Sequence, residues 1–249
     1  MKPKFLFILP LIVLFLSCEQ EKDQPVSLLI AGDSTAQSYN TTKTLMRGWA
    51  QMLPQFLDST ITVKNHAKAG RSTKSFIAEE RWAKVIEETQ PGDYVVIQFG
   101  HNDASSRPER HASYPEYRQN LVNMVNDVKA KQANPILATS IVMRTFKGKA
   151  LVDDRLLGYP VITRQVADSL NIPLLDIYSR SRDMIIMLGD EPSKELYMWF
   201  GPGLDSIRPD GSEDDTHLRE AGATAIAKLA AEEIKKLNLN NLSSHVLLP

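Results

Sequence analysis

From residue 26 onward, apolar residues fall into five short runs, and between the runs apolar positions recur every three or four residues. Short apolar runs are typical of buried strands, and the wider spacing is typical of helices with one face against a core. We expect strands at residues 26–31, 61–63, 93–99, 136–141 and 173–177. We expect helices at residues 47–57, 74–89, 117–131, 161–170 and 219–237. Alternating strands and helices of these lengths predict βαβ units, and hence an α/β domain with one mainly parallel sheet covered on both faces.

Two stretches depart from this regular pattern. The helix expected at residues 47–57 contains Pro54, which lacks a backbone N–H and should bend or shorten it. The segment between the fifth strand and Asp214 shows no clear period. We expect irregular structure there, and no second domain.

The N-terminal segment has the make-up of an export signal. Lys2 and Lys4 precede an apolar run at residues 5–16, which is too short to span a bilayer comfortably. The run ends in Leu-Phe-Leu-Ser-Cys, which resembles a bacterial lipobox with Cys18, the single cysteine, at the lipidation position. We therefore expect a signal peptide at residues 1–17, a lipidated tether at 18–25 and the domain at 26–249. The protein would be exported and would contact a membrane only through the lipid on Cys18, on the periplasmic or the outer side.

Composition adds limits on possible partners. With 43% hydrophobic and 24% charged residues, the chain resembles one ordinary globular domain. The formal net charge of −1 and the absence of a basic stripe argue against nucleic acid as a partner.

Ser34 is the candidate nucleophile. The first apolar run stops at Gly32, so Ser34 should lie at the carboxyl edge of the sheet, where ligands of open α/β sheets bind. A helix could begin there, and its free N–H groups would favour developing negative charge. The competing interpretation is that Ser34 only caps that helix.

His217 and two aspartates are the candidate partners of this serine. A serine needs a base to take its proton, and a carboxylate that orients the base. Asp214 lies three residues before His217, so a turn could fold its side chain back onto the imidazole. Asp215 is equally close in sequence and remains an alternative. The non-catalytic interpretation of both aspartates is that they cap the last helix.

Gly70 and Asn102 are candidate donors to an oxyanion. Gly70 follows the second strand, where the lack of a Cβ lets an N–H approach a ligand. Asn102 follows the third strand and offers a side-chain amide. With the amide of Ser34 they would form an oxyanion hole at neighbouring strand ends. Each residue alone could equally be an ordinary turn residue.

These residues together resemble the four blocks of the SGNH (GDSL-like) hydrolases: Gly32-Asp33-Ser34, Gly70, Gly100-His101-Asn102-Asp103, and Asp214 with His217. The resemblance implies a flavodoxin-like three-layer α/β/α sandwich with a five-stranded sheet. It also implies a triad of Ser34, Asp214 and His217, an oxyanion hole of Ser34, Gly70 and Asn102, and no metal or cofactor.

Within that superfamily the chain looks like the rhamnogalacturonan acetylesterase branch, carbohydrate esterase family 12. The resemblance is carried by Gly32-Asp33-Ser34-Thr35-Ala36, Gly48-Trp49, Asn65-His66-Ala67, Gly70-Arg71-Ser72, Gly100-His101-Asn102-Asp103 and Asp215-Thr216-His217-Leu218. It implies an acetylated polysaccharide or oligosaccharide as substrate, with xylan or another acetylated glycan as the alternative to rhamnogalacturonan. The chain departs from the branch at residues 104–115 and 206–213. Arg71, Arg144 and Trp199 are candidates for contacting an acidic sugar or stacking on a ring, against the alternative of surface charge or packing.

Two other classes of protein share some of these features. A metallophosphoesterase would share Gly-Asp and Gly-Asn-His motifs, but here His101 precedes Asn102 and no Asp-x-His lies before Gly32. A glycan-binding lipoprotein without turnover would not need an intact serine, histidine and carboxylate.

Overall fold

A single parallel sheet forms the centre of the molecule. The computed structural model describes residues 26–152, 155–156 and 158–248. The expected signal peptide, Cys18 and the tether therefore lie outside the described residues. The sheet has five parallel strands in the order β3-β1-β4-β5-β8. Its strands are β1 (Ser27–Gly32), β3 (Thr62–Asn65), β4 (Tyr94–Gln98), β5 (Asn134–Ala138) and β8 (Leu174–Leu175). All five strands expected from the apolar runs are thereby confirmed.

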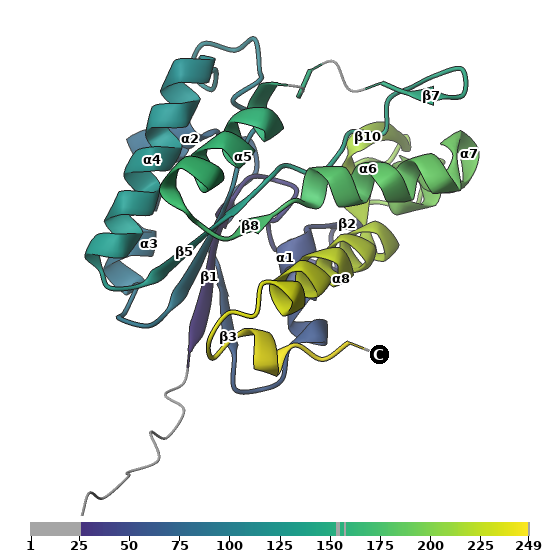
Figure 1. The fold of residues 1–249 in the computed structure, drawn as a ribbon. Coiled ribbons are helices and arrows are strands. Elements are labelled where there is room, and N and C mark those ends of the chain that lie inside the picture. The colour runs from purple at the N-terminus through teal and green to yellow at the C-terminus, as the bar shows by residue number, and fades with distance from the viewer. Residues whose placement is uncertain (1–25, 153–154, 157, 249) are drawn as a thin grey trace, which may run out of the picture.

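Helices cover both faces of this sheet, as Figure 1 shows. One face carries α2 (Thr73–Ala78), α3 (Arg81–Glu88), α4 (Tyr114–Ala130) and α5 (Gly158–Leu170). The other carries α1 (Trp49–Met52), α6 (Ile177–Leu188) and α8 (Glu220–Lys236). The expected three-layer α/β/α sandwich is confirmed. Among the described helices, none is both long enough and apolar enough to cross a bilayer.

Strand β1 shows how the sequence builds two cores at once. Side chains of a strand alternate between its two faces. Leu28 and Ile30 therefore enter the core under α1 and α8, whereas Leu29 and Ala31 enter the core under α2 to α5. All four are fully buried, which explains why β1 reads as a continuous apolar run.

Two expected helices are interrupted for local backbone reasons. The helix expected at residues 74–89 is divided into α2 and α3, because Glu80 adopts the left-handed conformation with φ of 57°. The helix expected at residues 47–57 is the short α1 followed by a 3₁₀ turn, η1 (Leu53–Phe56), in its second half. Pro54 lies near the start of η1 and cannot donate to the preceding turn.

The segment expected to be irregular contains regular structure instead. It holds α6, α7 (Asp190–Ser193), the 3₁₀ turn η2 (Lys194–Leu196) and strand β9 (Tyr197–Phe200). A second, antiparallel sheet has the order β2-β10-β9, with β2 at Met46–Arg47 and β10 at Ser212–Arg219. A small hairpin of β6 (Phe146–Lys147) and β7 (Ala150–Leu151), and the turn η3 (Ser243–His245), complete the described elements.

The strand order places the loops after β1, β3 and β4 beside one another. The chain goes from β1 outward to β3 and then returns across β1 to β4. The order therefore reverses between β1 and β4, and ligands of open α/β sheets bind at such a reversal. The three loops contain Ser34, Gly70 and Asn102, in that order.

Candidate active site

Ser34 lies in a turn directly after β1. The expectation that a helix begins at this position is wrong: the Ala36 N–H donates to the Asp33 carbonyl at 3.3 Å, and the next helix, α1, begins only at Trp49. A helix N-terminus therefore contributes nothing at Ser34. The Ser34 side chain is only 6% exposed, so its hydroxyl is held within the protein surface.

Hydrogen bonds to the Asp33 side chain hold this turn in place. Its buried carboxylate accepts hydrogen bonds from the Thr35 N–H at 2.9 Å and the Thr35 hydroxyl at 2.8 Å. Burial raises the pKa of Asp33, and the bonds from Thr35 offset only part of that rise. The Trp49 indole N–H donates to Gln98 Oε1 on β4, and Thr35 Oγ1 lies 3.1 Å from the same oxygen, so Gln98 connects the turn to the neighbouring strand.

His217 connects Ser34 to Asp214. The Nε2 atom of His217 lies 2.9 Å from Ser34 Oγ, and its Nδ1 lies 2.8 Å from Asp214 Oδ2. An ionised carboxylate can only accept, so the proton belongs on Nδ1 and leaves Nε2 free to accept from the serine. The structure thus brings together the serine, the imidazole and the first of the two candidate aspartates.

An irregularity in β10 makes the Asp214 to His217 contact possible. The pairing of β10 with β9 shifts register between Asp214 and Leu218, as a β-bulge does. Asp214 also accepts the backbone N–H groups of Thr216 and His217, at 2.9 and 3.0 Å. The expected turn at these residues is therefore a bulged strand, and it folds the carboxylate back onto the ring in the same way.

Hydrogen bonding keeps Asp214 ionised. Burial alone would raise the pKa of Asp214, but the hydrogen bonds and charge of His217 and the Thr216 N–H outweigh burial and hold the pKa well below its usual range. Arg208 Nη2 also lies 3.2 Å from Asp214 Oδ2. The imidazole therefore faces a full negative charge.

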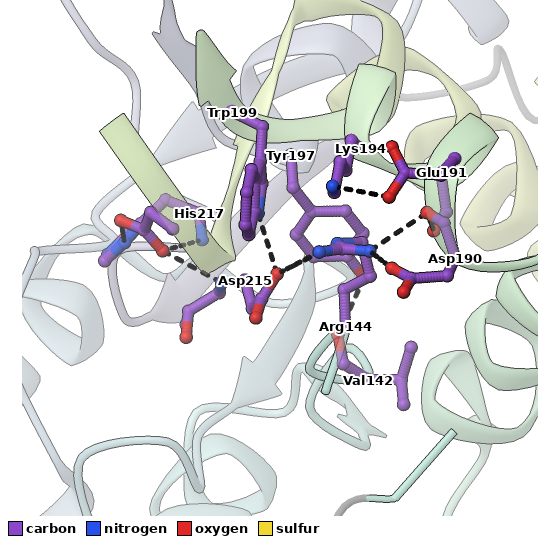
Figure 2. A network of polar contacts seen from close by, with 12 residues as sticks. Val142, Arg144, Asp190, Glu191, Lys194, Tyr197, Trp199, Asp215 and His217 are labelled. Carbon is purple, nitrogen blue, oxygen red and sulfur yellow. Dashed lines mark hydrogen bonds and ion pairs between the residues drawn. The ribbon is translucent and has the colours of Figure 1, made fainter. Parts of the chain in front are cut away.

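Asp215 faces a different set of partners, which Figure 2 shows. Its Oδ1 lies 2.9 Å from Arg144 Nε and 2.7 Å from Trp199 Nε1. The backbone N–H of Arg144 donates to the Asp215 carbonyl at 2.8 Å. Arg144 also binds Asp190 and stacks 4.8 Å from the centroid of the Trp199 ring. Asp215 thus joins a structural network and leaves His217 to Asp214.

Gly70 and Asn102, the candidate oxyanion donors, line the same pocket as Ser34. Gly70 has φ of +77°, which strongly favours glycine, and a Cβ there would lie 3.2 Å from the Arg110 guanidinium. The Asn102 side-chain N–H donates to the Arg71 carbonyl at 3.1 Å. An amide nitrogen carries two hydrogens, so the second remains for a ligand.

Asp103 holds these two loops together. Its buried carboxylate accepts the Thr73 N–H at 3.0 Å and the Thr73 hydroxyl at 2.5 Å. Burial raises the pKa of Asp103 to about 7, despite the bonds from Thr73. Thr73 follows the Gly70 loop and Asp103 follows Asn102, so this contact fixes the spacing of the candidate donors.

A pocket of about 350 Å³ opens over these groups. It is lined by Ser34, Ala69, Gly70, His101, Asn102, Ser105, Arg107, Arg110, Arg155, Thr216 and His217. The serine, the imidazole and both candidate donors thus share one cavity, of a size that fits a small ligand. Within the described ranges, no group of three His, Cys, Asp or Glu side chains is arranged to hold a metal ion.

The three residues expected to contact sugar do not line this pocket. Arg71 pairs with Glu79, at 3.0 Å, and donates to the Ala69 carbonyl. Arg144 is 3% exposed and, like Trp199, belongs to the Asp215 network (Figure 2). The alternative of satisfied packing therefore describes these side chains in the structure.

Sequence reasoning missed three arginines that do line the pocket: Arg107, Arg110 and Arg155. The first two lie in the charged stretch at residues 104–115, which departs from the branch pattern. The charge of this stretch was the available signal. The sequence alone does not show that these side chains line the pocket.

Comparison with known proteins identifies the family. Residues 30–225 match the model of the GDSL-like lipase/acylhydrolase family, and the chain belongs to this family of carboxylic ester hydrolases. It is 36% identical over 216 residues to "Rhamnogalacturonan acetylesterase RhgT" of Bacillus subtilis, a match that covers 87% of this chain and 92% of the relative.

Solved structures agree on the fold. The crystal structure of Bacillus subtilis YxiM superposes with a TM-score of 0.74 at 27% identity, covering 88% of this chain and 58% of that longer one. Axe2, an acetyl-xylooligosaccharide esterase from Geobacillus, superposes with a TM-score of 0.63 at 19% identity, covering 84% and 93%. The second likeness shows the fold alone.

Proposed function

We propose that this protein is a serine esterase that removes O-acetyl groups from rhamnogalacturonan, with Ser34 as nucleophile. The observation that carries the proposal is the continuous hydrogen-bonded line from Ser34 through His217 to Asp214, which ends in the pocket. That order of groups activates a hydroxyl for attack on an ester.

In the first half of the reaction, Ser34 Oγ attacks the acetyl carbonyl carbon while His217 Nε2 takes the hydroxyl proton. The C–O bond to the sugar then breaks, and His217 returns the proton to the departing sugar hydroxyl. In the second half, water loses a proton to His217 and attacks the acetyl carbon. The bond from that carbon to Ser34 Oγ then breaks, acetate is released, and His217 returns the proton to Ser34 Oγ. The ionised Asp214 stabilises the imidazolium in both halves.

The tetrahedral oxyanion needs donors that are already in place. The Ser34 N–H, the Gly70 N–H and the free hydrogen of the Asn102 amide come from three neighbouring strand ends and border the same pocket. Removal of one such donor costs about 3–4 kcal/mol of transition-state stabilisation in comparable sites.

The substrate assignment rests on similarity to RhgT, which covers nearly the whole described domain. Xylan or another acetylated glycan is the second candidate. A glycan-binding protein without turnover is the remaining alternative, and the intact line of reacting groups argues against it.

The test has two parts. Ser34→Ala should lower acetate release by about 10⁴-fold or more, while Ser38→Ala, which removes an exposed hydroxyl from the same loop, should retain it. Circular dichroism of both variants checks folding. Retained turnover in folded Ser34→Ala would place the nucleophile elsewhere.

Acetate release should then be compared across acetylated rhamnogalacturonan, xylan and homogalacturonan. We expect the highest kcat/KM on rhamnogalacturonan. A preference for xylan would overturn the substrate but leave the esterase mechanism intact, and a small chromogenic acetate reports the mechanism separately.

A further inference from the structure

We propose that Arg107, Arg110 and Arg155 form a subsite that binds the ionised carboxylate of a uronic acid in the glycan, beside the acetyl group that is attacked. The inference rests on the proposed esterase function and specifies how the same pocket selects its substrate.

The charge of the pocket is one-sided. All three arginines line the cavity that contains Ser34 and His217, and no acidic side chain lines it among the residues that the structure describes. Arg107 and Arg110 come from the loop between β4 and α4, whereas Arg155 comes from the segment between β7 and α5. Two separate segments thus bring positive charge to one cavity.

These guanidinium groups have no carboxylate partner among the described residues. Other arginines in the same range do have one, including Arg71 with Glu79, Arg144 with Asp215, Arg164 with Asp176 and Arg180 with Glu232. A guanidinium is always charged and binds a carboxylate through two parallel hydrogen bonds. The pocket arginines therefore remain available for a carboxylate that a ligand supplies.

Arg110 lies beside Gly70. Its guanidinium atoms are 3.2 to 3.5 Å from the position that a Cβ on Gly70 would occupy. Gly70 is one of the proposed oxyanion donors, so a carboxylate bound by Arg110 would lie next to the acetyl group under attack. The side chain is also only partly exposed, which strengthens an ionic contact relative to one in open water.

Arg155 also affects the protonation of a histidine that lines the pocket. Burial and the positive charge of Arg155 lower the pKa of His101 to about 3. His101 lines the pocket and is therefore neutral near pH 7. The positive charge of this cavity at that pH comes from the arginines.

The chemistry of the two candidate glycans differs at this point. A galacturonic acid residue carries a carboxylate on its ring, whereas the xylose ring has no carboxylate. The subsite would therefore favour an acetylated uronate over a neutral acetylated glycan.

The experiment compares substrates that differ only in this charge. Acetylated rhamnogalacturonan oligosaccharides are assayed with free carboxylates and after methyl esterification, with an aryl acetate as the third substrate. Arg110→Gln, Arg107→Gln and Arg155→Gln are the variants. Arg182→Gln is the matched control, because Arg182 is exposed on α6 and does not line the pocket.

We expect Arg110→Gln to lower kcat/KM about tenfold or more on the free acid, as for loss of a charge-assisted contact, with smaller losses for the other two variants. On the methyl ester and the aryl acetate, each variant should stay within about twofold of the parent, as should Arg182→Gln on all three. Added salt should weaken the parent only on the free acid.

The outcomes separate this proposal from the one on which it rests. If the parent hydrolyses the free acid and the methyl ester equally well and the variants change neither, the subsite is wrong and the esterase assignment stands. If Arg110→Gln loses activity equally on the aryl acetate, Arg110 serves the oxyanion, and its part in the subsite is wrong. If the parent cleaves only the aryl acetate, the glycan assignment itself fails.

Discussion

Asp214 and Asp215 are neighbours in the chain, yet they belong to different parts of the molecule. Successive side chains of a strand point to opposite faces. Asp214 therefore reaches His217, while Asp215 reaches Arg144 and Trp199 behind the strand. The sequence left the choice between the two aspartates open. The directions of their side chains along β10 place Asp214 against His217 and Asp215 against Arg144.

The ionisation of Asp214 leads to a prediction about pH. Its pKa is held well below the usual range, so Asp214 keeps its charge as the pH falls to about 4. Only the proton on His217 Nε2 should then inactivate the enzyme on the acid side, because a protonated ring cannot accept from Ser34. A plot of log kcat/KM against pH should fall on acidification with a slope of one.

A limiting slope of two above pH 4 would show that Asp214 titrates with the ring, and a flat profile would contradict the role of His217. The same carboxylate affects stability in the matching direction. Because its folded pKa is lower than its unfolded pKa of about 3.9, the stability it contributes is present above that pH and is lost as the pH falls toward the folded value.

At the scale of elements, the bulged part of β10 contacts the buried side chain of Arg144. Arg144 binds the Asp215 side chain and its backbone carbonyl, and extends to Asp190. These contacts hold the strand at Asp215, one of the two residues between Asp214 and His217. We interpret Arg144 as a positioning residue that acts through β10.

Arg144→Lys tests this interpretation. Lysine keeps the charge but cannot reproduce the forked contacts, so we expect kcat to fall about tenfold or more with little change in KM, because β10 then holds His217 less accurately. Weaker contacts to Asp215 and Asp190 should also lower the thermal midpoint.

The matched control is Lys194→Gln. Lys194 pairs with the exposed Glu191 and stacks on Trp199, and it is not part of the ion pair between Arg144 and Asp215. An exposed pair contributes about 1 kcal/mol at most, so kcat should be nearly unchanged. An Arg144→Lys enzyme with parental kcat and a lowered midpoint would show that the network only stabilises the fold.

The elements that the sequence predicted are those with a strong local period. The five central strands are apolar runs, and α4 carries an apolar stripe that includes Leu121, Met124, Val125 and Val128. Strand β10, by contrast, reads Ser-Glu-Asp-Asp-Thr-His-Leu-Arg and has no apolar alternation. Its pairing with β9 and β2 is long-range, and nothing local announces it. For the same reason, the sequence alone does not show that Arg107, Arg110 and Arg155 line one pocket.

At the scale of the whole molecule, the reversal of strand order explains why distant residues meet. Ser34, Gly70 and Asn102 follow three adjacent strands, and β10 brings His217 to the same edge from the other end of the chain. The sheet is rigid because both faces are buried under helices. A site built on its strand ends is therefore preorganised for charge that develops during the reaction.

The lipid anchor should be separable from catalysis. The proposed reacting residues all lie at position 34 or later, and we propose that lipid on Cys18 holds the exported protein at a membrane. In the full chain, Cys18→Ala should abolish incorporation of labelled fatty acid and move the protein from the membrane fraction to the aqueous fraction. Purified variant and parent should have the same kcat/KM, since the domain is unchanged.

Ser17→Ala is a suitable control, because it alters the neighbouring residue and keeps the thiol. Equal labelling of the parent and Cys18→Ala would show that lipid is attached elsewhere or not at all. Loss of turnover in purified, folded Cys18→Ala would contradict the independence of the domain from its tether.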